Sequence, residues 1–169
     1  IVVTTLQGLE EVLAKALADL FRTPIKIFNR AIECEGNWAQ LYKCNYLLRT
    51  AIRVLVHLKD FEIKEQQDLY DAFRSIDWSK YITRKKTIAI RGSVGGEIFH
   101  NSQFAMMRAK DAIVDQLRDE HGFRPNVNLK NPDITIHIRL HGEQLSISLN
   151  SSGHSLHLRN YRYRLYKAP

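Results

Sequence analysis

The chain has 169 residues, of which 44% are hydrophobic and 25% charged, a composition that excludes a disordered, collagen-like or low-complexity protein. No apolar run approaches the roughly 20 residues of a membrane-spanning helix, which excludes a helical membrane protein. The formal net charge is +7, with 25 Lys and Arg against 18 Asp and Glu, and this excess favours a polyanion as the partner.

The first third of the chain alternates strand and helix patterns in the order β-α-β-β-α-β. The expected elements are a strand over 1–5, a helix from Gly8 to Pro24, strands over 25–28 and 31–34, a helix over 36–48 and a strand over 52–58. This order is that of a ferredoxin-like unit, which we expect to end near Phe61.

A second unit of helices and strands is expected after the first. Its elements are a helix over 66–75, a strand over 87–91, a helix from Asn101 or Ser102 to Gly122, and strands over 134–140 and 145–149. The last two strands alternate apolar and polar residues on either side of a turn at 141–143, which predicts an antiparallel hairpin with one apolar and one polar face. The predicted fold class is therefore α+β.

The sequence contains no catalytic constellation that can be assigned, since it lacks GxSxG, HExxH, a P-loop and paired carboxylates. The segment Gly92–Gly96 follows a strand and precedes a helix, as a phosphate loop does, but it departs from GxGxxG and is interpreted as an ordinary strand-to-helix turn. His137 and His141 share a strand face without a cysteine or a suitably spaced acid, so no metal site is expected. Cys34 and Cys44 are interpreted as thiols of a reducing, cytoplasmic compartment, and their spacing leaves a single disulfide open.

All of the +7 net charge lies after Ser75, because basic and acidic residues balance over the first part of the chain. Three basic segments follow, namely Arg84–Lys86 before a strand, Arg108 and Lys110 on the long helix, and a tail over 158–164 that alternates arginine and tyrosine. Such a tail combines phosphate contacts with stacking surfaces, which is typical of nucleic-acid binding. Each segment also has another interpretation: a solvated turn, an ion-pair surface in which Asp111 and Asp115 pair with Arg108, and a linker against a neighbouring domain.

Several motifs, taken in their order along the chain, carry a resemblance to a known family. They are Asn101–Phe104, Arg108–Asp115, Pro125–Val127, Asn131–Ile134 and Ser155–Arg162, accompanied by Thr5–Glu10 and Asp68–Trp78. Together they resemble the N-terminal part of bacterial THUMP-domain methyltransferases, the type that methylates guanine N2 in 23S ribosomal RNA. The resemblance covers nearly the whole chain, with departures at Asn160 and His154, where the family usually has glycine and an acid.

The resemblance implies a ferredoxin-like domain over 1–64, an α/β THUMP domain over 65–165 and, over 166–169, the start of a linker to a catalytic domain. In the family, these two domains present RNA to a class I catalytic domain that uses S-adenosylmethionine. This chain is therefore expected to hold no cofactor and no active site of its own. The implied partners are RNA, expected to be 23S ribosomal RNA, and the chain's own C-terminal methyltransferase domain, in the cytoplasm and without a membrane.

On this interpretation, cations of the second unit meet phosphates and tyrosines of the tail stack on unpaired bases. The residues predicted to contact RNA are Arg84, Lys85, Lys86, Arg108, Lys110, Arg124, Lys130, Arg159, Tyr161, Arg162, Tyr163 and Arg164. Three alternatives stay open: a module for transfer RNA, a DNA methylase, and an interaction module with little affinity for RNA.

Overall fold

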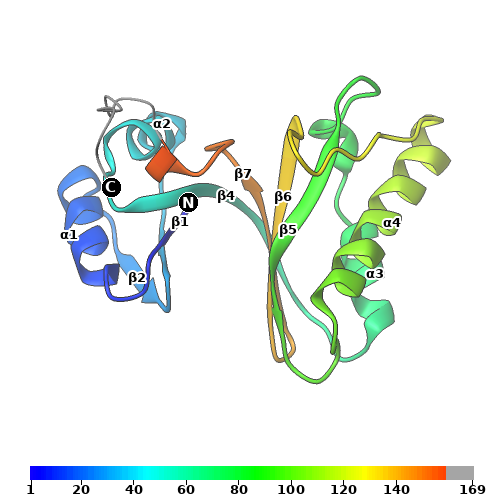
Figure 1. Cartoon of the computed structure of the whole chain (residues 1–169), viewed down its shortest axis with the longest axis horizontal. Coiled ribbons are helices and arrows are strands. Elements are labelled where there is room, and N and C mark those ends of the chain that lie inside the picture. The colour runs from blue at the N-terminus through cyan, green and yellow to red at the C-terminus, as the bar shows by residue number, and fades with distance from the viewer. Residues whose placement is uncertain (159–169) are drawn as a thin grey trace, which may run out of the picture. The chain divides into compact units, whose positions relative to one another are not determined.

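The structure, a computed structural model, describes residues 1–158, which form two compact units (Figure 1). The first unit comprises residues 1–56 together with residues 151–158, and the second comprises residues 57–150. Strand β4 (Ala51–Glu62) contributes its first half to one unit and its second half to the other. The domain boundaries at 64 and 165, which the family resemblance implies, differ from the limits of these units and stay predictions.

The first unit has the predicted β-α-β-β-α-β order. Its elements are β1 (Val2–Thr5), α1 (Glu10–Leu20), β2 (Ile25–Phe28), β3 (Ala31–Cys34), α2 (Trp38–Leu47) and the first half of β4. The strands lie in the order β2-β3-β1-β4, and β1 pairs antiparallel with both β3 and β4. Helix α2 begins at a capping box, in which the Asn37 and Gln40 side chains each accept a hydrogen bond from the other residue's amide.

The second unit continues with a mixed sheet and two helices. Its elements are the second half of β4, α3 (Gln66–Arg74), the short 3-10 helix η1 (Trp78–Lys80), β5 (Ile88–Gly95), α4 (Ser102–His121), β6 (Ile134–His141) and β7 (Gln144–Asn150). Strands β6 and β7 form the predicted antiparallel hairpin, whereas β5 pairs parallel with β6. A parallel pair needs a crossover connection, and α4 provides it. Both predicted ends of α4 are confirmed: the Asn101 side chain caps its start and Gly122, at φ 67°, ends it.

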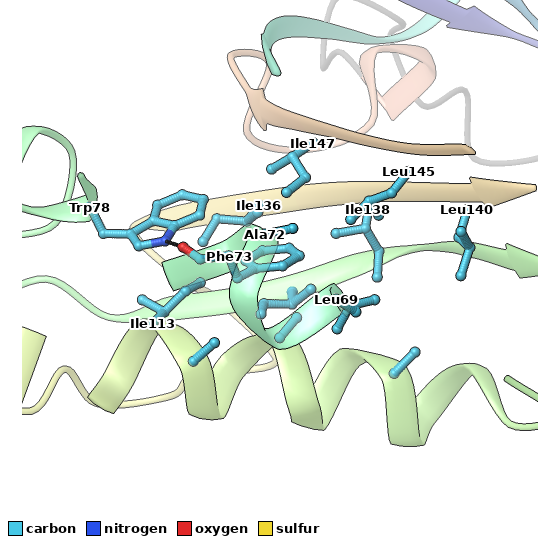
Figure 2. Close-up of a cluster of buried hydrophobic side chains, with 14 of the residues drawn as sticks. Leu69, Ala72, Phe73, Trp78, Ile113, Ile136, Ile138, Leu140, Leu145 and Ile147 are labelled. Atoms are coloured by element: carbon cyan, nitrogen blue, oxygen red, sulfur yellow. Dashed lines mark hydrogen bonds between the residues drawn. The ribbon is translucent and has the colours of Figure 1, made fainter. Parts of the chain in front are cut away.

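The core of the second unit forms where the apolar face of the hairpin meets helices α3 and α4 (Figure 2). The alternating apolar residues predicted for the hairpin are buried here: Ile136, Ile138, Leu140, Leu145 and Ile147. Trp78 is fully buried, and its indole Nε1 donates a hydrogen bond to the Phe73 carbonyl oxygen at 2.7 Å (Figure 2). The two rings stack with 5.7 Å between their centroids, so η1 is fixed to the end of α3.

The glycine segment Gly92–Gly96 does not form the predicted strand-to-helix turn, because β5 continues as far as Gly95. Gly92 lies opposite Ile138 of β6, and a Cβ at this position would come within 1.8 Å of the Ile138 carbonyl oxygen. Only glycine allows two backbones to approach this closely. The segment therefore serves strand pairing, and it is not a loop that could surround a phosphate.

Candidate nucleic-acid interface

Two connections of the second unit carry five of the predicted RNA contacts. The first, residues 81–87, leads from η1 to β5 and holds Arg84–Lys86. The second, residues 122–133, leads from α4 to β6 and holds Arg124 and Lys130. All five side chains are exposed to solvent.

Hydrogen bonds hold these two connections side by side at the start of β5. The Ile88 amide donates to the Asn126 carbonyl at 2.9 Å, and the Asn128 amide donates to the Ile88 carbonyl at 3.1 Å. Asp133 joins the two connections further, because its Oδ2 accepts hydrogen bonds from both the amide and the hydroxyl of Thr87, each at 2.7 Å. Positive charges from segments about 40 residues apart are thus gathered at one end of the second unit.

Asp133 is the only acidic residue in either connection. Hydrogen bonds from the Thr87 amide and hydroxyl hold the pKa of Asp133 below its ordinary value, and the nearby charge of Lys86 acts in the same direction. One Asp133 oxygen is therefore already engaged by Thr87. The net charge of the two connections is positive, which favours an anionic partner.

Two arginines at this end are held in place by their neighbours. The guanidinium of Arg84 lies over the Phe123 ring, 5.9 Å from its centroid. Arg91, which is not among the residues predicted to contact RNA, donates from Nη2 to the Leu129 carbonyl at 2.6 Å and is exposed. The one sequence signal for Arg91 is its place at the end of the strand expected over 87–91, directly after three buried residues. We call the following residues the cationic end: Arg84, Lys85, Lys86, Arg91, Arg124 and Lys130.

Arg108 and Lys110 do not join the cationic end. They lie in the first half of α4, so Arg108 is about 20 Å from the end of the helix at a rise of 1.5 Å per residue. Arg108 donates to Gln67 Oε1 at 2.6 Å and lies over the Tyr70 ring at 4.6 Å, both residues of α3. Lys110 pairs with Asp111 at 2.7 Å.

The alternative interpretation, in which Arg108 pairs with Asp111 and Asp115, is wrong. The guanidinium of Arg108 instead contacts two residues of α3, the side-chain amide of Gln67 and the ring of Tyr70. The other acid, Asp115, accepts from the Tyr70 hydroxyl at 2.8 Å and pairs with Arg118 at 3.1 Å. Arg108 and Asp115 therefore both contact α3, and the pairs of Lys110 with Asp111 and of Arg118 with Asp115 lie within α4.

The predicted contacts in the basic tail, Arg159, Tyr161, Arg162, Tyr163 and Arg164, lie outside the described residues. The segment that precedes them is attached to β4 within the first unit. Ser151 donates from both its amide and its hydroxyl to the Val54 carbonyl, at 3.0 and 2.7 Å, and the Val54 amide donates to Ser152 Oγ at 2.6 Å. Leu156 packs against the core of the same unit.

Within residues 1–158, no group of three or more His, Cys, Asp and Glu side chains is placed to hold a metal ion. Cys34 and Cys44 are both free and buried, so the disulfide that their spacing left open is not formed. Burial raises the pKa of the Cys44 thiol to about 12, which keeps it protonated at neutral pH. None of the described helices combines the length and the apolar character that crossing a membrane requires.

Two family models match the chain. The model of the THUMP domain matches residues 64–150, and the model of the RlmL ferredoxin-like domain matches residues 1–55. Among curated proteins, the ribosomal RNA large subunit methyltransferase K/L of Pseudomonas entomophila (strain L48) is 37% identical over 163 residues, which are 96% of this chain. Those residues are 22% of that protein, so the chain spans about a fifth of the length of this relative.

Solved structures share the fold over almost the whole chain. A predicted N6-adenine-specific DNA methylase from Listeria monocytogenes str. 4b F2365 superposes with a TM-score of 0.83 at 21% identity, over 99% of this chain and 44% of that one. A possible methylase from Clostridium difficile 630 gives a TM-score of 0.83 at 25% identity, over 95% and 43% of the two chains. The predicted fold class and the resemblance stated from the sequence are therefore confirmed, and the chain belongs to the THUMP domain family.

Proposed function

We propose that this chain is the RNA-binding region of an rRNA methyltransferase, acting on guanine N2 of 23S ribosomal RNA. Membership of the THUMP domain family and the name of the Pseudomonas relative support the class of enzyme. The structural observation that carries the proposal is the cationic end, where two connections joined by hydrogen bonds and the adjoining strand β5 expose six cations, and the two connections contain one acid.

The cationic end suits the phosphate backbone of RNA. Phosphate contacts by Lys and Arg supply affinity that is independent of sequence, and they fix the position of the nucleic acid. Arg84 is held over Phe123 and Arg91 is held by the Leu129 carbonyl, so both guanidinium groups lose little side-chain freedom on binding. Selectivity would come from RNA shape and from unpaired bases, since phosphates carry no sequence information.

The chemical step would take place outside this chain. The methyl group would come from S-adenosylmethionine in a catalytic domain, and the described residues do not fit that cofactor, because the glycine segment Gly92–Gly96 is largely part of β5. The role of this chain is to bind and orient RNA for that domain, which makes the domain its second partner. Ribosomal RNA as the substrate places the protein in the cytoplasm.

Transfer RNA offers the same phosphate chemistry and is the closest alternative substrate. Duplex DNA is less well suited, because the cations of α4 are interleaved with acids such as Asp111, Asp115 and Asp119 instead of forming one basic side for a groove. An interaction module with little RNA affinity is the remaining alternative. Each of these makes a different prediction in a binding titration.

The test is a titration of the 169-residue chain against 23S ribosomal RNA segments, transfer RNA and duplex DNA at several salt concentrations. Preference for one ribosomal segment at every salt concentration is expected. Substituting Lys85 and Lys86 by alanine should flatten the slope of log affinity against log salt by about one unit for each phosphate that is no longer neutralised. The matched control replaces two exposed lysines of the first unit, Lys15 and Lys26, which removes the same charge elsewhere.

Three results would each contradict part of the proposal. Tighter binding to transfer RNA than to any ribosomal segment would replace the substrate. Equal losses in the Lys85/Lys86 and Lys15/Lys26 variants would mean that net charge, and not the cationic end, drives binding. Absence of binding to any nucleic acid would favour the interaction module.

A further inference from the structure

Helix α2 presents three aromatic side chains to solvent on one side. Trp38 is 68% exposed, Tyr42 70% and Tyr46 83%, and the residues are spaced by four, which places them along one helix face. The opposite side of the helix is buried through Leu41 and Cys44. The exposed aromatic rings therefore lie outside the core of the first unit, and contiguous exposed apolar surface of this kind is typical of a binding site.

The surroundings of these rings in the sequence are basic. No Asp or Glu occurs between Gly36 and Lys59, whereas Lys43 lies on the exposed side of α2, one helical turn from Tyr46. Arg49 lies two residues after the end of the helix and is exposed. A surface that combines aromatic rings with cations is complementary to a nucleic acid in both its charge and its π faces.

We infer that this face of α2 is a second RNA-contact surface, on which unpaired bases stack against Trp38, Tyr42 and Tyr46. The inference rests on the proposed function and adds a surface in the first unit to the cationic end in the second. We call these three residues, together with Lys43, the stacking face.

The spacing of the rings fits this role. Two rings that are four residues apart on a helix are separated by about 6 Å along its axis. A base stacked between two rings needs about 3.4 Å on each side, which is nearly 7 Å between the rings. A modest tilt of the side chains would supply the difference, and none of the three rings is packed in the core. Lys43 is then placed to meet the phosphate that belongs to such a base.

The segment that leads toward the basic tail is attached next to α2. The Asn45 side chain donates from Nδ2 to the Ser151 hydroxyl at 3.0 Å and to the Leu41 carbonyl at the same distance. Residues 151–158 thus run from α2 along β4 of the first unit. The helix that carries the stacking face is therefore hydrogen-bonded to the segment that precedes the Arg- and Tyr-rich part of the sequence.

Trp38 supplies its own probe, because the chain has two tryptophans and the other, Trp78, is fully buried. The 169-residue chain would be titrated with an unlabelled single-stranded 12-nucleotide RNA of mixed sequence while tryptophan fluorescence is recorded. Stacking of a base on the exposed indole is expected to quench emission, and the quenching should disappear in Trp38→Phe. Tyr42→Ala and Tyr46→Ala should each weaken binding about 5-fold or more, whereas Tyr42→Phe should retain affinity.

The controls separate this inference from the proposed function. Phe104→Ala and Met107→Ala remove exposed apolar side chains of α4 and should leave RNA affinity unchanged. Circular dichroism would verify that every variant keeps the fold. Loss of binding in the Lys85/Lys86 variant with no change in the Tyr42 and Tyr46 variants would overturn the stacking face and leave the proposed function intact.

Two other outcomes would also overturn the stacking face. Unchanged affinity for RNA together with a shift from dimer to monomer in the Tyr42→Ala variant, measured by sedimentation, would assign the face to protein contacts. RNA binding that neither the Lys85/Lys86 nor the Tyr42 and Tyr46 substitutions change would contradict both proposals together.

Discussion

Replacing Gly92 by alanine tests the close approach of β5 to β6. The added methyl carbon would lie 1.8 Å from the Ile138 carbonyl oxygen and 2.7 Å from its carbon, so the two backbones must move apart. The φ of 153° is also one that alanine rarely adopts, which costs about 1–3 kcal/mol. Separation of the strands breaks one or two ladder hydrogen bonds at about 1 kcal/mol each. Together these effects should lower the free energy of unfolding by roughly 2–5 kcal/mol.

Thermal unfolding followed by circular dichroism measures this loss. A unit of this size loses about 4–8 °C in Tm per kcal/mol, so Gly92→Ala should unfold roughly 8–40 °C below the unmodified chain. The matched control is Gly95→Ala in the same strand, because a Cβ there meets no atom within 4 Å. A Tm of Gly92→Ala within about 2 °C of this control would refute the close approach. Loss of RNA affinity at an unchanged Tm would instead show that the glycine segment serves a ligand.

Three further predictions follow from buried or hydrogen-bonded groups. Gln116→Leu should cost about 1–3 kcal/mol in a urea titration, because the buried amide of Gln116 accepts from the Trp78 amide at 3.2 Å and donates to the Arg74 carbonyl at 2.6 Å; an unchanged midpoint would contradict this. Hydrogen bonds from Thr87 lower the pKa of Asp133 in the folded chain, so its carboxylate stabilises the fold above the unfolded pKa, near 3.8. This contribution is lost as the pH falls through the folded pKa. Asp133→Asn should therefore flatten the acid side of a plot of Tm against pH relative to the unmodified chain. Iodoacetamide at pH 8 should leave Cys44 unmodified in the folded chain and label it in urea, because burial raises the pKa of its thiol to about 12; mass spectrometry distinguishes the two results.

Local signals in the sequence were sufficient to predict most helices and strands. The ends of α4 could be read from Asn101 and Gly122, because a cap involves only the adjacent turn of backbone. The hairpin β6–β7 followed from strict alternation of apolar residues, and the burial of Ile136 and Ile147 matches that pattern. Such features depend on neighbours within a few residues, which the sequence displays directly.

The features that the sequence did not predict depend on contacts far apart in the chain. From the sequence alone, Gly92 is expected to be a turn residue. In the structure it pairs with Ile138, which lies 46 positions later in the chain. Arg108 has acids at helical spacing, yet its contacts are with Gln67 and Tyr70 of α3. Residues of this kind are placed by packing between elements, for which periodicity gives no signal.

The same reasoning applies to the candidate interface. Arg84–Lys86, Arg124 and Lys130 were predicted as separate basic residues, and the sequence could not show that Asn126 and Asp133 would hold their two connections together. The aromatic rings of α2 also follow a helical stripe, which sequence patterns associate with burial. Only the structure distinguishes the buried stripe of that helix from the exposed one.

The two RNA-contact surfaces that we propose should respond differently to salt. Phosphate contacts release bound counterions, so removing a cation changes the slope of log affinity against log salt, whereas removing a stacked ring changes affinity by the same factor at every salt concentration. Tyr42→Ala should therefore give a line parallel to that of the unmodified chain, and the Lys85/Lys86 variant should give a flatter one. A flatter line for Tyr42→Ala would contradict stacking, because a neutral ring releases no ions and its removal could alter the slope only by displacing charges that meet phosphates.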